Sequence, residues 1–408
     1  MLTGTQGQNM LDRLGVGPLI NGHHWRTLLG GSIMLPEVLD AMVESADTFL
    51  NITELHRKAG EYIAELSGAD MALVTAGCTG AQLLQAAACM TGTDESKVMR
   101  LPDTTGMKNE ILIGKPQSNH YDGAFRLAGA KAIEIGTETD TTPDELANAI
   151  NDRTAAVAYT WVMRWKGLSL EETLRIAHDH DVPVILDAAS ELPPVENLTK
   201  FIRMGVDMVA FSGGKGLRAP QSTGILIGRK DLMEAAYANA FSFNKPKASI
   251  GRPMKIAKEE IVGLITALEI FVNADHEAEW ADWRAKSQVV VDAMQNTSHV
   301  GAHVYEGPVY PGPNAPTAVI TLDDSWTGPT PAEITEKFRN GELPIYIGDG
   351  PAANVLWVAP VALKDGEAEL IAERLVGVLA EYACKYDRTQ GDACESSLED
   401  IWSKPIHI

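Results

Sequence analysis

Short apolar runs alternate with amphipathic segments from about residue 55 to residue 230, and this alternation constrains the fold more than any other feature. The strand-like runs include residues 71–75, 155–162, 183–186 and 208–211, and helical spacing is found at residues 53–67 and 170–180. Strands that alternate with helices along a chain form a parallel sheet with helices on both faces. We therefore predict an α/β fold with a mainly parallel, doubly wound sheet.

A lysine between two of these runs is the first candidate functional residue. Residues 208–211 form an apolar run that stops at Ser212-Gly-Gly, Lys215 follows, and a second apolar run spans residues 224–228. An amine held between two core strands is poorly solvated, which favours its neutral, nucleophilic form. The alternative is an ordinary surface lysine in a glycine-rich hairpin.

A carboxylate follows the preceding strand. Residues 183–186 are apolar, and Asp187 comes directly after them, with Ser190 three residues further on. Lys215 lies 28 residues after Asp187, which leaves room for one helix and one strand. Because parallel strands end at the same edge of a sheet, we expect Asp187 and Lys215 to converge there.

A glycine-containing turn offers a site for an anion. The strand at residues 71–75 is followed by Ala-Gly-Cys-Thr-Gly-Ala and then by a helix of small residues. The free amides and the dipole of a helix N-terminus attract phosphate, and we expect Gly77, Cys78 and Thr79 to contribute. A plain strand–helix connection is the alternative at this position.

An amine, a carboxylate at a strand end and a phosphate site together match pyridoxal 5′-phosphate (PLP). The PLP aldehyde reacts with a lysine, its pyridine nitrogen pairs with a carboxylate, and its phosphate is held by a helix N-terminus. Ser212 can add a hydroxyl to the phosphate site, and Ser190, three residues after Asp187, is a further candidate cofactor contact. A dinucleotide fold would carry G-x-G-x-x-G near its first strand, and this chain does not.

Two histidine-containing segments invite other interpretations. His120, in Asn119–Asp122, is our candidate for stacking on the cofactor ring, although the neighbouring Tyr121 or an ordinary loop remains possible. His23 and His24 are adjacent, but they have no cysteine or acidic partner at ligand spacing. We therefore predict no metal site.

Composition excludes several partners. A net charge of −21 argues against a nucleic-acid surface, which needs clustered Lys and Arg. The apolar runs are shorter than a membrane span, and the N-terminus lacks the features of a signal peptide. Four cysteines without metal spacing indicate free thiols, so we expect a cytoplasmic protein without nucleic-acid or membrane partners.

The predicted domains follow from these patterns. Residues 1–48 form an N-terminal segment that joins the small domain or a dimer interface, residues 49–244 a large cofactor-binding domain, and residues 245–408 a smaller α+β domain. We expect one long helix over residues 256–294, because apolar residues recur at helical spacing.

These motifs resemble the fold-type I PLP-dependent enzymes, and in particular the group of selenocysteine synthase (L-seryl-tRNA selenium transferase) and D-glucosaminate-6-phosphate ammonia-lyase. The resembling segments are Leu19–Gly22, Leu66–Ala69, Thr75–Gly77, Gly129–Lys131, Asp187–Ala189, Ser212–Lys215, Pro220–Gly224 and Gly251–Glu260. The resemblance implies that Lys215 forms the internal aldimine, that Asp187 pairs the ring nitrogen and that Gly77–Gly80 holds the phosphate. It also implies a homodimer or higher homo-oligomer with shared active sites. Residues 1–18 leave little room for the tRNA-binding region of selenocysteine synthases, and the acidic charge also argues against tRNA.

From the resemblance we expect a lyase acting on a hydroxylated amino acid, such as a sugar-derived one, that releases a 2-keto acid and ammonia. Lys215 would remove the α-proton as a general base. Arg26, Arg218 and Arg252 are the candidates for the substrate carboxylate, since residues 345–363 contain no arginine; Arg218 could instead bind the cofactor phosphate. Racemase, aldolase or aminotransferase activity is the alternative, with selenium transfer less favoured, and a non-catalytic binding protein is a third possibility.

Overall fold

The computed structural model describes residues 10–240, 248–307 and 315–383, so the outer ends of the predicted domains lie outside the described residues. Two compact units are present. The large unit spans Arg26–Ala274, and the small unit combines residues up to Trp25 with those from Asp275 onward. Within the described residues, every helix is too short or too polar to cross a membrane.

The described part of the large unit contains a seven-stranded sheet in the order β2-β8-β7-β6-β5-β3-β4. Its strands are β2 (Met71–Ala76), β3 (Glu110–Gly114), β4 (Lys131–Ile135), β5 (Thr154–Thr160), β6 (Val184–Asp187), β7 (Met208–Ser212) and β8 (Thr223–Gly228). Only β8 runs against the others in this sheet, because residues 213–222 join it to β7 without a crossover helix. The predicted mainly parallel α/β fold is confirmed.

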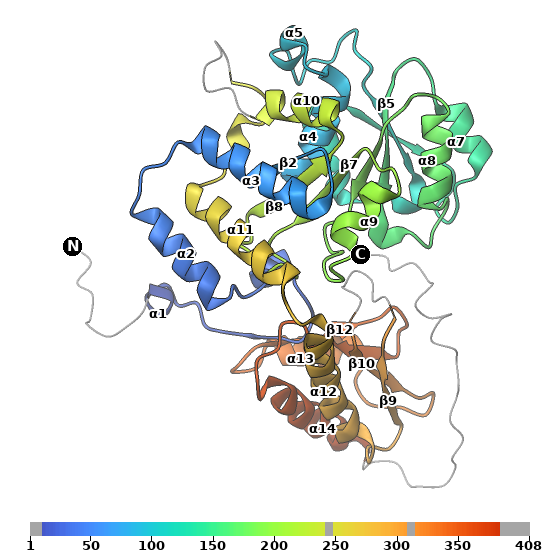
Figure 1. The fold of residues 1–408 in the computed structure, drawn as a ribbon. Helices are drawn as coiled ribbons and strands as arrows, with labels where there is room; N and C mark the ends of the chain where they lie inside the picture. The colour runs from blue at the N-terminus through green and yellow to red at the C-terminus, as the bar shows by residue number, and fades with distance from the viewer. Residues whose placement is uncertain (1–9, 241–247, 308–314, 384–408) are drawn as a thin grey trace. The chain divides into compact units, whose positions relative to one another are not determined.

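Helices cover both faces of this sheet (Figure 1). Alternate residues of β7 show why: Val209 and Phe211 enter one apolar layer, whereas Met208 and Ala210 enter the other. The first layer is closed by α2 (Pro36–Ala46), α3 (Ile52–Ser67), α7 (Pro143–Ala149), α8 (Leu170–His178), α9 (Asn197–Arg203) and α11 (Lys258–Val272). The second is closed by α4 (Gly77–Thr91), α6 (Gly123–Leu127) and α10 (Lys230–Ala240).

Shorter elements connect these layers. They are α5 (Glu95–Val98) and the 3-10 helices η1 (Thr27–Leu29), η2 (Lys115–Gln117), η3 (His120–Asp122), η4 (Trp161–Met163) and η5 (Arg252–Met254). Three of them, η2, η3 and η4, follow the carboxyl ends of β3 and β5, on the edge of the sheet where Asp187 ends β6.

The prediction of one helix over residues 256–294 is wrong. The chain instead forms α11 and α12 (His276–Met294), separated by Asn273, Ala274 and Asp275. Asp275 accepts a hydrogen bond from the backbone N–H of Ala278, which starts a new helix. The boundary between the two units falls at this break, because α11 packs into the core of the large unit. The sequence instead predicts a domain boundary between residues 244 and 245.

The small unit is an α+β structure. In its described residues, β9 (Val300–Tyr305), β10 (Thr317–Leu322), β12 (Gly348–Asp349) and β13 (Val355–Val358) form an antiparallel sheet in the order β12-β13-β10-β9. A second pair joins β1 (Ile20–Asn21) to β11 (Ile345–Tyr346), and α1 (Met10–Leu14) precedes it. The longer helices are α12, α13 (Pro331–Arg339) and α14 (Glu367–Ala383).

Candidate active site

The structure brings Asp187 and Lys215 to the same edge of the large sheet. The strands β6 and β7 are parallel neighbours, with Asp187 paired to Ala210, so both strands end together. Lys215 lies in the turn directly after β7, and it is half-buried. Cys78 Sγ lies 3.5 Å from Asp187 Oδ1, and Gly216, beside Lys215, packs on Leu192, the residue after Glu191. Asp187 raises and Lys215 lowers the pKa of both the Cys78 thiol and the Glu191 carboxyl.

The turn that carries Lys215 is fixed by close packing of its glycines. A Cβ atom at Gly214 would collide with the backbone of Gln221, and one at Gly216 would collide with the carbonyl of Leu192. The spacing of glycines around Lys215 is therefore required by contacts on both sides of the turn, rather than by flexibility. The Leu192 contact also places the loop after β6 directly against this lysine turn.

Asp187 is held by three neutral donors. Gln82 Nε2 donates to Oδ2 at 2.6 Å, the backbone N–H of Ala189 donates to Oδ1 at 2.9 Å, and Cys78 Sγ lies 3.5 Å from Oδ1. Burial raises the pKa of Cys78 well above its usual value, so this thiol keeps its proton and acts as a donor. Gln82 was not predicted from the sequence, although its four-residue spacing from Cys78 puts both on one face of α4.

The start of α4 lies where the sequence predicts an anion site. Gly77 has a φ of +71°, and Ala76 precedes the helix without a side-chain cap. The first backbone N–H groups of α4, at Gly77, Cys78 and Thr79, thus have no carbonyl within the helix to bond. A Cβ atom at Gly224 of β8 would collide with Gly77, so this glycine lets the turn lie flat on the sheet edge.

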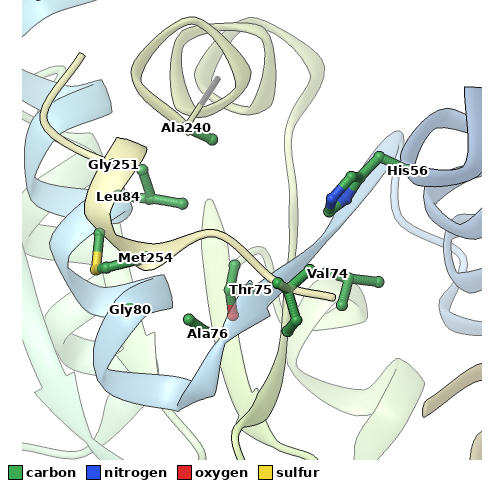
Figure 2. Close-up of a pocket in the computed structure, with 10 residues that line it drawn as sticks. His56, Val74, Thr75, Ala76, Gly80, Leu84, Ala240, Gly251 and Met254 are labelled. Atoms are coloured by element: carbon green, nitrogen blue, oxygen red, sulfur yellow. The ribbon is translucent and has the colours of Figure 1, made fainter. Parts of the chain in front are cut away.

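A small cavity lies behind the first turn of α4 (Figure 2). His56 borders it from α3, Gly80 from α4, and Gly251 and Met254 from the segment around η5. Its volume of about 10 Å³ has room for about one water molecule, so it is not the cofactor cavity. Burial lowers the pKa of His56 to about 4, which keeps the imidazole neutral there.

The loop that carries Arg26 packs on the lysine turn. A Cβ atom at Gly31 would lie 2.8 Å from the carbonyl oxygen of Gly214, and Gln221 Nε2 donates to the carbonyl of Thr27 at 3.2 Å. Arg26 closes this loop by bridging to Gly31. One of the three predicted substrate-binding arginines therefore belongs to a segment in contact with the proposed reaction centre.

The other two arginines differ in their settings. Arg218 follows Lys215 by three residues and has a φ of +53°, and its backbone N–H donates to the Lys215 carbonyl at 2.9 Å. Arg252 begins η5, whose last residue, Met254, borders the cavity behind α4. Both are half-buried.

The segment around His120 presents a buried carboxyl rather than a buried ring. His120 is exposed, with its ring centroid 4.0 Å from that of Tyr121. Asp122 is buried and accepts from Ser118 Oγ at 2.7 Å and from the backbone N–H of Asn119 at 3.0 Å. Burial raises the pKa of Asp122, and the nearby charge of Asp187 adds to that rise. Stacking of His120 on the cofactor stays a prediction.

Glu191 and Arg164 were also missed from the sequence. Glu191 is only 12 % exposed, and its Oε2 lies 3.9 Å from Nη1 of Arg164 in the loop after η4. Ser190 Oγ, which we predicted as a cofactor contact, donates to Glu191 Oε1 at 3.4 Å. Burial raises the pKa of Glu191, while Arg164 lowers it, Asp187 raises it and Lys215 lowers it by smaller amounts. No local sequence pattern distinguishes this carboxyl from a surface one.

These residues fit PLP. The carboxylate of Asp187 is fixed by Gln82 and Ala189 at a strand end, and the amine of Lys215 lies at the end of the next strand. The open amides of α4 lie at the end of β2 in the same sheet. This arrangement defines a PLP-dependent enzyme with the aminotransferase type of fold.

Comparison with known proteins supports that class. The sequence model described as aminotransferase class-V matches residues 123–308. The 5′-C-glycyluridine monooxygenase-decarboxylase of a Streptomyces species is 31 % identical over 379 residues, covering 90 % of this chain and 92 % of the relative. The D-glucosaminate-6-phosphate ammonia lyase of Salmonella typhimurium is 30 % identical over 387 residues, covering 92 % of this chain and 99 % of the relative.

A solved structure agrees with the sequence relatives. The structure of D-glucosaminate-6-phosphate ammonia-lyase superposes with a TM-score of 0.78 at 29 % identity, covering 93 % of this chain and 100 % of that chain. The L-seryl-tRNA(Sec) selenium transferase of Solidesulfovibrio magneticus is 25 % identical over 386 residues, or 85 % of this chain and 78 % of the relative. The chain belongs to the PLP-dependent family that includes this ammonia-lyase and resembles the selenocysteine synthases, as the sequence predicted. Its cofactor is PLP.

Proposed function

We propose that this protein is a PLP-dependent lyase that converts a hydroxylated amino acid into a 2-keto acid and ammonia. The observation that carries the proposal is the meeting of Lys215, Asp187 and the start of α4 at one sheet edge. Similarity to an ammonia-lyase along 99 % of that relative's length favours elimination on an aminosugar acid over the other PLP reactions.

Each part of the site then has a defined role. PLP, when bound, withdraws electrons from the α-carbon of an amino acid. Asp187, fixed by Gln82, supplies the negative charge that holds a proton on the ring nitrogen. Gly77, Cys78 and Thr79 present N–H groups to the phosphate, and Ser212 and Ser190 are further candidate contacts. Lys215 removes the α-proton of the substrate as a general base.

The substrate carboxylate needs a cation with forked geometry. Arg26 is the favoured candidate, because its loop contacts the lysine turn through Gly31 and Gly214. Arg218 and Arg252 remain candidates for the carboxylate or for a phosphate group, as predicted.

A second function is favoured by one specific observation. The relative named as a monooxygenase-decarboxylase is as similar to this chain as the ammonia-lyase is. An enzyme of that kind would consume O₂ and release the substrate carboxylate as CO₂, whereas a lyase does neither.

The test is a screen of the PLP-loaded protein against hydroxylated D- and L-amino acids and against D-glucosaminate with and without a 6-phosphate. We expect ammonia and a 2-keto acid in equal amounts, with no amino acceptor present and no O₂ uptake. A requirement for a keto-acid acceptor would identify an aminotransferase and contradict the proposal. O₂ uptake with CO₂ release would support the second function instead.

The proposed assembly is a homodimer or higher homo-oligomer. Large apolar side chains are exposed on one stretch of the large unit, namely Leu28, Ile33, Leu39, Val43 and Phe49. Apolar surface of this extent is typical of an interface. Analytical ultracentrifugation of the wild type and of Val43→Asp is the test, and a monomeric wild type would contradict the assembly. A cytoplasmic location and the lack of a nucleic-acid partner stay predictions.

A further inference from the structure

The loop after β6 holds a carboxyl directly beside the lysine turn. Within this loop the N–H of Glu191 donates to the carbonyl of Ala188 at 3.1 Å, and Asn197 Nδ2 donates to the carbonyl of Glu191 at 2.7 Å. The next carbonyl, of Leu192, packs so tightly on Gly216 that no Cβ atom would fit there. The backbone of Glu191 is therefore fixed one residue away from a contact with the turn of Lys215.

The Glu191 side chain is largely buried, and few polar contacts replace the water that its carboxyl has lost. Its strongest polar contacts are a long hydrogen bond from Ser190 at 3.4 Å and the guanidinium of Arg164 at 3.9 Å. Arg164 is 31 % exposed, so its charge is partly screened by water. The charges that act on Glu191 are those of Arg164, Asp187 and Lys215.

A second buried carboxyl nearby has a different setting. Asp122 accepts two short hydrogen bonds and closes the capping box of η3 with Asn119. Those bonds offset the burial of the Asp122 carboxyl, so its role as a helix cap is enough to explain it. Glu191, by contrast, caps no helix. Burial disfavours its charged form and its polar contacts are weak, so the pKa of the Glu191 carboxyl is raised and the group holds its proton more tightly than in water.

We propose that Glu191 is a further catalytic residue, the acid that protonates the leaving β-hydroxyl group of the substrate. The inference rests on the proposed function, because a hydroxyl at the β-carbon must leave. As Lys215 takes the α-proton, the electrons of that C–H bond form the new carbon–carbon double bond, and the C–O bond breaks. Its electron pair takes the proton of the Glu191 carboxyl, so water departs and Glu191 is left as a carboxylate. Arg164 then stabilises that carboxylate.

The first experiment varies the leaving group. The PLP-loaded wild type, Glu191→Gln and Glu196→Gln are compared on D- and L-serine and on β-chloroalanine of the same configuration, which all yield pyruvate. Chloride leaves without a proton, so we expect Glu191→Gln to slow release from serine by about 10²-fold or more and to leave release from β-chloroalanine little changed. Glu196, an exposed residue five positions later without a side-chain cap bond, is the matched control. Equal losses on both substrates, or no loss on either, would overturn the role of Glu191.

The second experiment needs no turnover. The visible absorbance of the PLP-loaded protein is titrated with pH in the same three proteins, because a carboxyl beside Lys215 changes that absorbance when it ionises. We expect one inflection of the wild type to be missing from Glu191→Gln and kept in Glu196→Gln. If Glu191→Gln keeps every inflection, the carboxyl is not in the reaction centre and the inference fails. By contrast, a wild type that shows this inflection but releases ammonia from no hydroxylated amino acid overturns the proposed function.

Discussion

Buried or partly buried carboxyl groups lie at both edges of the large sheet, and their partners differ between the two edges. The amino edge is the one at which the parallel strands begin, and the carboxyl edge is the one at which they end. At the amino edge, Glu110 begins β3 and accepts from Arg153 Nε at 2.5 Å and from Asn151 Nδ2 at 2.9 Å. Asp207 precedes β7 and accepts from Arg229 Nη1 at 2.6 Å. These carboxylates are matched by short bonds that include a guanidinium.

At the carboxyl edge, Asp187 ends β6 and Glu191 lies in the loop after it, and within the described part of the chain neither has a positive charge in close contact. Asp207 also accepts from His178 Nε2 at 2.8 Å and from the N–H of Val184 at 2.7 Å, whereas Asp187, at the other end of β6, meets an amide, a thiol and a backbone N–H. Glu191 meets its arginine only at 3.9 Å. Charge that is balanced within the protein serves the fold, and charge left poorly balanced in a cluster indicates a site for a charged ligand. The contrast therefore assigns structure to Glu110 and Asp207 at the amino edge. It assigns chemistry to Asp187 and Glu191 at the carboxyl edge, where Asp122 is a structural cap.

Replacing the lysine at the carboxyl edge should give the largest effect. Lys215→Ala removes both the amine that attaches PLP and the base that takes the α-proton, so we expect turnover to fall by about 10³-fold or more. The visible absorbance of the attached cofactor should also disappear. Lys230→Ala, which changes an exposed lysine at the start of α10, is the control and should change neither. Turnover that survives Lys215→Ala would contradict the assignment of the carboxyl edge.

Replacing the strand-end aspartate should give the next largest effect. Asp187→Asn keeps an oxygen for the N–H of Ala189 but removes the charge opposite the ring nitrogen, and we expect kcat to fall by about 10²–10³-fold. Because the partners of Asp187 are neutral donors, the free energy of unfolding should change little. A large loss of stability with normal kcat would mean that this edge, too, is structural.

Replacing the amino-edge aspartate should do the reverse. Asp207→Asn leaves Arg229 and His178 without their buried partner, and we expect the free energy of unfolding in urea to fall by about 2–3 kcal/mol. Asp231→Asn removes an exposed partner of the same arginine and should cost less than about 1 kcal/mol. The visible absorbance of the loaded protein should be unchanged in both variants. An altered visible absorbance of the PLP-loaded Asp207→Asn variant would contradict the assignment of Asp207 to structure alone.

The sequence predicted the positions of the strand ends well, for a physical reason. Strands buried on both faces appear as uninterrupted apolar runs, so the first polar residue after each run, such as Asp187 or Ser212, marks the edge of the sheet. Glycines beside Lys215 marked a tight turn in the same way. Features that depend on a local sequence pattern could therefore be predicted, including the start of α4 at Gly77.

Contacts between segments that are distant in the sequence could not be predicted from local sequence patterns. Gln82 reaches Asp187 across 105 residues, and Glu191 meets Arg164 only because the loops after β5 and β6 are neighbours in the folded sheet. The break at residues 273–275 was hidden because apolar spacing continues on both sides of it. A short Asn-Ala-Asp sequence ends one helix and caps the next there, and the two helices belong to different units.

The smallest expected effects are changes in the free energy of unfolding, and their direction should differ between the two edges. One carboxyl is replaced at each edge. Asn151 and Arg153 hold the pKa of Glu110 below its usual range, so its contribution to stability is present above the unfolded pKa of about 4.3 and is lost as pH falls through the folded value. Because Arg153 is mostly exposed, we expect Glu110→Gln to lower stability at neutral pH by about 1 kcal/mol or less.

Glu191→Gln should act in the opposite direction. Burial raises the pKa of Glu191, so the folded protein loses stability as pH rises from the unfolded pKa through the folded one, and the loss is complete above it. Removing the carboxyl removes that loss, so the variant should be slightly more stable than the wild type at high pH and indistinguishable from it in acid. Urea unfolding midpoints of the cofactor-free proteins at several pH values measure both variants. If the two substitutions shift the midpoint in the same direction at pH 8, the edges do not differ in how they balance charge, and the carboxyl cluster around Lys215 is structural.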